Sequence, residues 1–195
     1  MYVKKAIRAQ ATRTRLEHVA RGLFAERGFA EVSAEELVAR AGVTRGALYH
    51  HYNGKEGLFE TVVESVMKDV HSKLAADAAG QPDPLRGLHR GIETFLKICT
   101  QPAVQRILLI DAPAILGWPK WREMDARYGL GLLRGALSGA MKAGLLRTQD
   151  ADVLAHLLLG ALIEAAMMIG RSKSPLKSRK AAEKALASMI SGWRA

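Results

Sequence analysis

The sequence contains little cysteine, few aromatic residues and no long uninterrupted apolar run. Its single cysteine, Cys99, cannot form an internal disulfide, so the chain does not need an oxidising compartment. The basic start of the chain is not followed by an apolar segment, and we therefore expect no secretory signal. The most apolar stretch, 153–169, is interrupted by a histidine, a glycine and a glutamate. We expect it to fall short of the roughly 20 apolar residues that span a bilayer. These absences predict a soluble, cytoplasmic protein with no membrane partner.

Residue spacings typical of catalytic and metal sites are also missing. There is no glycine-rich phosphate loop, no nucleophile elbow and no carboxylate pair in an obvious catalytic setting. His50 and His51 are adjacent, and neighbouring side chains on a helix point about 100° apart, which does not suit one metal ion. We therefore expect no enzyme activity, no metal and no cofactor.

The charge that is present is mostly positive and gathers at the two ends. Lys and Arg number 29 against 19 Asp and Glu, a formal net charge of +10. Residues 1–15 hold five basic and no acidic side chains, and residues 171–195 hold seven basic side chains against one glutamate. A basic N-terminal arm suits contact with nucleic-acid phosphates, and it also suits a terminus that is simply solvated. The charge therefore raises DNA as a partner without establishing it.

Hydrophobic periodicity is helical throughout, and the alternation typical of strands is almost absent. The residues Leu16, Val19, Ala20 and Leu23, for example, follow the i, i+3, i+4, i+7 rule. The fold class is therefore predicted as all-α, with about nine helices. A change from short to longer helices near residue 54 predicts an N-terminal domain over 1–54 and a second domain over 55–195. The expected helices are 11–27, 34–41, 45–51, 55–80, 85–100, 103–111, 119–143, 150–171 and 177–193.

Residues 33–51 fit a helix-turn-helix. Ser33 and Glu36 have the spacing of a capping box, and Thr44 is a good N-cap for the second helix. In this motif the N-terminal end of the second helix enters the DNA major groove, where Arg45 can reach a guanine edge. An ordinary helical hairpin has the same spacing, so this pattern alone leaves both interpretations open.

The block AGVTRGALYHHYNGKEGLF, residues 41–59, makes the resemblance specific: residues 11–60 resemble the tetracycline-repressor (TetR) family. The resemblance implies three DNA-binding helices, a connecting fourth helix and a helical domain for ligand binding and dimerisation. It implies a homodimeric repressor released by a small-molecule effector from a near-palindromic site on double-stranded DNA. Glu35 is unfavourable for a helix that lies near the DNA backbone, because its negatively charged carboxylate repels phosphate. The DNA-binding residues implied by position are Ser33, Thr44, Arg45, Gly46, Ala47, Tyr49, His50, Tyr52 and Lys55.

The last two predicted helices are candidates for the dimer interface. The helix 150–171 is apolar nearly all round, so it needs cover from its own core and from a second subunit. The helix 177–193 is amphipathic, and burial of both helices inside a monomer remains the alternative. The interface residues we expect are Leu159, Ile163, Leu186, Met189 and Ile190.

Aromatic residues concentrated in 111–128 suggest a pocket for an apolar or aromatic effector. A stripe of aromatics at helical spacing is also typical of plain core. Glu164 interrupts the most apolar helix, so a cationic effector, an internal arginine or solvent is expected to meet its carboxylate. The glycines at 131, 135 and 139 fit either a close helix approach or room for a ligand. The ligand-binding residues we expect are Phe95, Cys99, Trp118, Trp121, Tyr128, Glu164 and Met168.

Two other functions remain open from the sequence. One is a helical DNA-binding regulator without an effector, and the other is a protein-interaction module whose helix-turn-helix no longer binds DNA. Binding to a short palindrome separates both DNA-binding interpretations from the third, and release by a small molecule separates the first two from each other.

Overall fold

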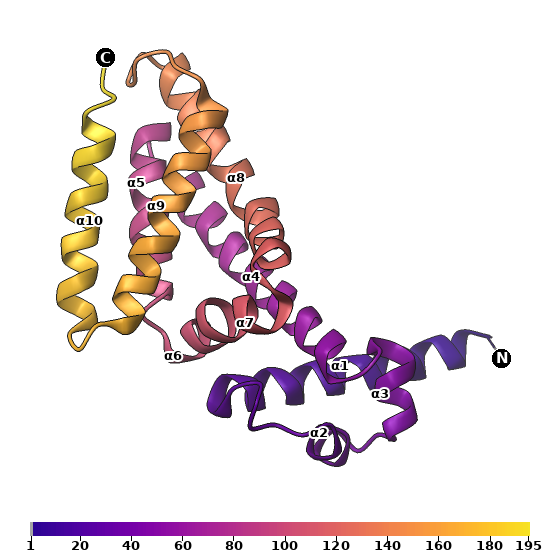
Figure 1. Cartoon of the computed structure of the whole chain (residues 1–195). Helices are drawn as coiled ribbons and strands as arrows, with labels where there is room; N and C mark the ends of the chain where they lie inside the picture. The colour runs from indigo at the N-terminus through magenta and orange to yellow at the C-terminus, as the bar shows by residue number, and fades with distance from the viewer. Residues whose placement is uncertain (1) are drawn as a thin grey trace. The chain divides into compact units, whose positions relative to one another are not determined.

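A computed structural model describes the backbone of residues 2–195 and the side chains from residue 6 onward. Within that range the chain is all-α, as predicted, and its β-structure is limited to one isolated bridge between Leu146 and Arg194. The segments α6, η1 and α7 follow one another without a break, so the described residues form nine helical segments (Figure 1). The elements are α1 (Tyr2–Arg27), α2 (Ala34–Ala41), α3 (Arg45–Tyr52), α4 (Lys55–Ala79), α5 (Pro84–Ile98), α6 (Pro102–Val104), η1 (Gln105–Asp111), α7 (Ala112–Leu116), α8 (Trp118–Lys142), α9 (Ala151–Arg171) and α10 (Pro175–Ser191).

The chain folds into two compact units, which differ from the domains expected with a boundary at residue 54. One unit comprises Met1–Val66 and Pro102–Trp121, and the other comprises Met67–Gln101 and Arg122–Ala195. The segment 102–121 joins the N-terminal unit because α6 and η1 pack against α1. The basic N-terminal arm expected over residues 1–15 is not a separate segment, because α1 begins at Tyr2 and includes it. The side chains of Lys4 and Lys5 lie outside the described residues.

In the first unit, local capping fixes the helix ends that the sequence predicts. The Ser33 hydroxyl accepts a hydrogen bond of 3.0 Å from the Glu36 amide at the start of α2. Gly42 ends α2 in the left-handed conformation, with φ of 62°. Three buried rings then form the core between α1 and α4: Phe24, Phe29 and Phe59. Their centroids lie 5.0–5.7 Å apart, within the range of favourable aromatic contact.

The segment from α6 to α7 is tied to the end of α1 by a side-chain hydrogen bond. The Phe29 amide donates to the Asp111 carboxylate over 2.8 Å. Gly28 has φ of 84°, a conformation that side chains strain, and a Cβ there would make a tight contact of 3.2 Å with that carboxylate. Pro113 lies in the first turn of α7, where its missing N–H is tolerated, within the unbroken segment.

In the second unit, α9 packs against α5 and α10. By length and composition alone α9 is apolar enough to cross a membrane, contrary to expectation. Nine of its residues are buried within the protomer, as in the core helix of a globular protein. Gly139 of α8 allows close helix approach, since a Cβ there would lie 3.2 Å from Pro84. Gly131 and Gly135 are exposed and have no such neighbour.

Candidate nucleic-acid interface and effector site

The helix α3 presents its N-terminal half to solvent. Thr44 caps it, its hydroxyl accepting a hydrogen bond of 3.2 Å from the Ala47 amide. Leu48 is fully buried and anchors the helix to the unit. The outward residues are those that the sequence singled out, with Ala47 half-buried and the rest exposed: Arg45, Gly46, Ala47, Tyr49 and His50. This surface offers a cation, an aromatic ring and small residues beside a solvent-exposed helix N-terminus, the chemistry that major-groove recognition uses.

Arg45 has a partner that its spacing in the sequence did not reveal. Its Nη1 lies 2.9 Å from Oε1 of Glu35 on α2, and its guanidinium lies 5.6 Å from the centroid of the Tyr49 ring. Tyr49 first, and then the negative charge of Glu35, raise the pKa of Arg45. Both members of the pair are mostly exposed, so water screens it. Glu35 therefore holds the guanidinium of Arg45 in the free protein.

Tyr52 and Lys55, expected near phosphates, have their polar atoms engaged inside the unit. Tyr52 is buried, and its hydroxyl donates to Oε1 of Glu17 over 2.7 Å. Burial, followed by that hydrogen bond, raises the pKa of Tyr52 to about 12. Lys55 Nζ donates to the carbonyl oxygens of Val32 at 2.9 Å and Phe29 at 3.1 Å, and lies 3.9 Å from the Phe29 ring centroid. This geometry favours a structural role for both side chains.

Replacing Lys55 tests that structural role. Lys55→Met removes a charged donor from two carbonyl groups and is expected to lower the free energy of unfolding by roughly 1.5–3 kcal/mol. Denaturant unfolding measures the loss, and Arg8→Met, which removes an exposed cation from α1, serves as the control. Unchanged stability together with a flatter salt dependence of DNA binding would instead assign Lys55 to phosphate contact.

The residues expected around an effector fall in both units. Trp118 and Trp121 belong to the first unit. Trp121 is 1% exposed, and its Nε1 donates a hydrogen bond of 2.8 Å to the Leu108 carbonyl, while Trp118 is half exposed. In the second unit Cys99 is buried, and Phe95 and Tyr128 are half-buried. Tyr128 packs edge-on to His71, with ring centroids 6.1 Å apart. Phe95 lies on α5, Cys99 caps the end of that helix, and Tyr128 lies on α8.

Glu164 and Met168 lie on the exposed face of α9 in the protomer. The argument for a cationic effector required a buried carboxylate, and Glu164 is not buried. The second unit also holds a mostly buried carboxylate that sequence reasoning missed, that of Asp125, whose side chain is 18% exposed. It lies 2.6 Å from Arg122 Nη1, and burial raises its pKa to about 6 although Arg122 opposes the shift. Burial, and then the charge of Asp125, raise the pKa of Cys99 to about 12.

The raised pKa of Asp125 predicts a pH-dependent stability. The folded protein binds the proton more tightly than the unfolded chain, so the stabilisation is complete below the ordinary pKa of 3.8 and is lost as the pH rises through about 6. Asp125→Asn is expected to abolish this dependence, which amounts to roughly 3 kcal/mol at most. Urea unfolding of both proteins across this range measures it. Glu123→Gln, on the exposed side of the same helix, should follow the wild type.

Comparison with known proteins identifies the family. A family model described as "Bacterial regulatory proteins, tetR family" matches residues 18–62, and one described as "Tetracyclin repressor-like, C-terminal domain" matches residues 85–193. A TetR-family regulator of known structure from Pectobacterium atrosepticum is 31% identical, with a TM-score of 0.86 and 96% of each chain covered. The transposon Tn10 TetC protein of Escherichia coli is 28% identical over 77% of this chain and 76% of its own length. RolR in complex with resorcinol, 21% identical, has a TM-score of 0.75 over 95% of this chain and 90% of its own, and shares the fold. The chain belongs to the TetR family of DNA-binding transcriptional regulators, which are not enzymes.

Proposed function

We propose that this regulator is a homodimeric repressor that binds a near-palindromic operator and is released by a small aromatic effector. The observation that carries the DNA part is the capped, solvent-facing start of α3, with Arg45 at its first position. The proposed contacts divide by chemistry. Arg45 and His50 read base edges, and Gly46 and Ala47 permit close approach. Ser33, Thr44 and Tyr49 contact phosphates, and the amides at the helix N-terminus assist them.

Dimerisation is supported by an unpartnered apolar face on α9. Val153, Leu157 and Met168 are 53%, 62% and 45% exposed, although the helix is otherwise apolar. They recur at intervals that place them on one side of the helix, with Glu164 among them. Four of the five residues expected at the interface are instead at most 6% exposed within the protomer: Leu159, Ile163, Leu186 and Ile190. We therefore propose that the interface is formed by the exposed face of α9, with Met189 of α10 as a further exposed candidate.

Arg45→Ala tests the DNA-binding proposal. If Arg45 reads a guanine, the variant should lose roughly 1–3 kcal/mol of binding free energy on the selected operator and less on random DNA. Fluorescence anisotropy at fixed salt measures both affinities, since affinity for DNA depends strongly on salt. Equal losses on the two DNAs would exclude base reading by Arg45.

Glu35→Gln is the complementary variant. It removes the carboxylate that competes with DNA for Arg45, and it also removes a negative charge from the DNA-facing surface. We expect tighter binding to both operator and random DNA. Weaker binding to the operator would mean that Glu35 orients Arg45 productively rather than competing for it.

The effector proposal is supported by RolR, which shares this fold and is bound to resorcinol. The half-buried Phe95 and Tyr128 and the buried Cys99 of the second unit offer aromatic and weakly polar contacts of the kind that small-molecule sites use. A panel of small phenols that includes resorcinol is titrated into the operator complex. Release by a phenol at saturating concentration supports the proposal, while an operator complex unaffected by the panel would favour a regulator without an aromatic effector.

A further inference from the structure

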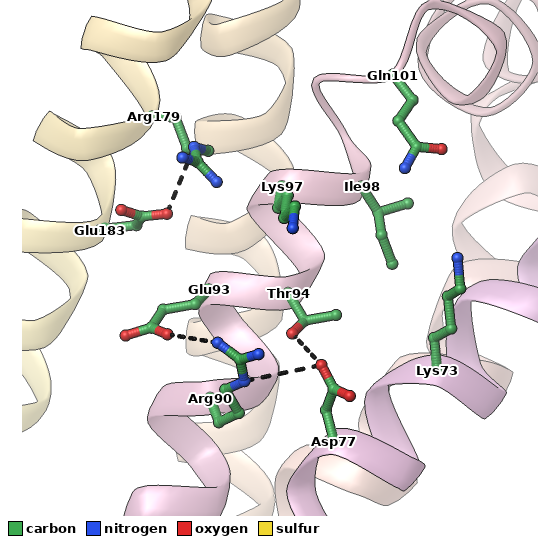
Figure 2. Close-up of a pocket in the computed structure, with 10 residues that line it drawn as sticks. All are labelled: Lys73, Asp77, Arg90, Glu93, Thr94, Lys97, Ile98, Gln101, Arg179 and Glu183. Atoms are coloured by element: carbon green, nitrogen blue, oxygen red, sulfur yellow. Dashed lines mark hydrogen bonds and ion pairs between the residues drawn. The ribbon is translucent and has the colours of Figure 1, made fainter.

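The second unit contains a polar cavity that is separate from its aromatic residues. Its volume is about 550 Å³, within the range of small-molecule sites. The walls come from α4, α5, α10 and the short connection that follows α5 (Figure 2). Four basic and three acidic side chains contribute to it, and its full lining is Lys73, Asp77, Arg90, Glu93, Thr94, Lys97, Ile98, Gln101, Arg179 and Glu183.

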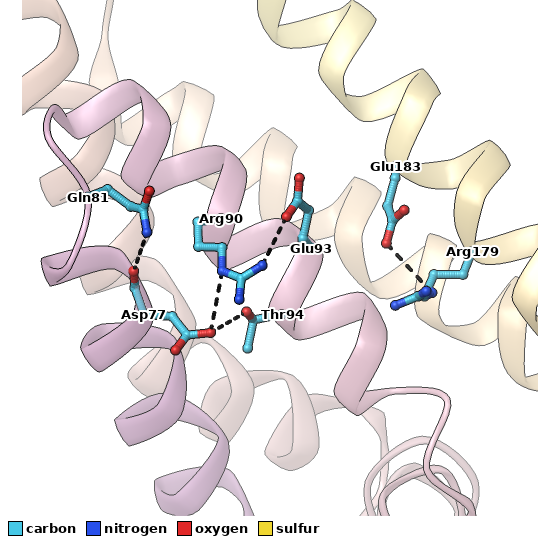
Figure 3. A network of polar contacts seen from close by, with 7 residues as sticks. All are labelled: Asp77, Gln81, Arg90, Glu93, Thr94, Arg179 and Glu183. Carbon is cyan, nitrogen blue, oxygen red and sulfur yellow. Dashed lines mark hydrogen bonds and ion pairs between the residues drawn. The ribbon is translucent and has the colours of Figure 1, made fainter.

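The carboxylates of the cavity already have partners. Asp77 accepts a hydrogen bond of 2.6 Å from the Thr94 hydroxyl and lies 3.8 Å from Arg90 Nε. Arg90 also contacts Glu93 at 3.3 Å, as Figure 3 shows. Glu183 lies 3.6 Å from Arg179 Nε on the same helix, α10. The two arginines therefore pair with all three carboxylates, and with the two lysines the lining carries four positive against three negative charges.

The cations are not all balanced in this way. Among the described residues, no hydrogen bond or ion pair joins the side-chain ammonium group of Lys73 or Lys97 to a neighbour, and Figure 2 shows both side chains at the cavity. Arg179 Nε is buried and makes no hydrogen bond, although Glu183 is near. A buried donor without an acceptor costs free energy, so an acceptor supplied by a ligand is favourable.

We propose that this cavity binds a small anion carrying a carboxylate or phosphate group. Lys73 from α4 and Lys97 from α5 supply the two ammonium groups, and Arg179 from α10 supplies donors that Glu183 does not fully satisfy. Charge-assisted hydrogen bonds from several cations are the usual means of holding such groups. Thr94 and Gln101 add neutral polar groups to the lining. The site is distinct from the aromatic effector site proposed above and does not depend on it.

Isothermal titration calorimetry of the full chain tests the proposal with citrate and with inorganic phosphate. Ionic strength is held constant with sodium chloride, so that general screening does not imitate binding. If only citrate binds saturably, the site is assigned to carboxylates, and if only phosphate does, it is assigned to phosphates. Saturable binding of both assigns the site to anions in general. No saturable binding of either anion at millimolar concentration would overturn the proposal.

Three variants and one control locate the binding. Lys73→Gln and Lys97→Gln are each expected to weaken anion binding about tenfold. Glu183→Gln is expected to strengthen it several-fold, because it frees Arg179, and a gain of affinity cannot arise from misfolding. Lys142→Gln removes an exposed lysine of α8 outside the cavity and should have no effect. Losses as large in Lys142→Gln, or a Glu183→Gln variant that binds no tighter, would place the anion elsewhere.

Discussion

Gly57→Ala is expected to destabilise the DNA-binding unit by on the order of 3–5 kcal/mol. A Cβ at this position would lie 1.7 Å from the carbonyl oxygen of Tyr52, far closer than non-bonded atoms approach one another. Because the obstacle is backbone at the end of α3, no side-chain rotation relieves it. The first turn of α4 or the end of α3 has to move. Denaturant unfolding measures the loss, and operator affinity should fall with it.

The matched control is Gly22→Ala in α1 of the same unit. A Cβ there has nothing within 4 Å, and the position lies within a helix. Alanine is a better helix former than glycine, so this variant should gain about 0.5–1 kcal/mol. Gly57→Ala with wild-type stability would show that the turn between α3 and α4 adjusts freely, and that α3 is not held in place by this contact.

Local signals in the sequence predicted most helix ends of the described chain. Ser33 and Thr44 cap the helices that they were expected to cap. The turn between α3 and α4 lies at Asn53 and Gly54, a pair typical of turns, with φ of 57° and 104°. Gly57 was not singled out, because its constraint comes from backbone five residues away across a turn rather than from its own conformation.

Side-chain roles were harder to predict where the partner is distant in the sequence. Tyr52 contacts Glu17, and Lys55 contacts the carbonyl of Phe29, 26 residues before it. A position on a helix shows which residues share a face, but packing decides whether that face is exposed. For the same reason Glu164 was weighed as a buried carboxylate, whereas Asp125 received no attention. The outward residues of α3 were predictable because the apolar side chain of Leu48 marks the side of that short helix that packs.

A charged substitution on the exposed face of α9 is expected to separate the subunits. Leu157→Glu combined with Met168→Glu places two carboxylates on the apolar face that we propose meets its equivalent in a second copy. Burying an unpaired charge costs several kcal/mol, so the variant should sediment as a monomer of 21.2 kDa. Operator affinity should fall by at least about 100-fold. In the dimer, binding of one recognition helix holds the second near the other half-site, and a monomer loses this advantage.

Two comparisons separate dissociation from unfolding. Ile110→Glu introduces the same charge at a residue of η1 that is 56% exposed, and should leave the dimer intact. Leu186→Glu alters a residue that is 6% exposed within the protomer, and should lower thermal stability rather than yield a folded monomer. The wild type is expected to be a dimer at micromolar concentration. If it sediments as an intact monomer there, the α9 face is not an interface, and binding to a two-fold operator loses its structural basis.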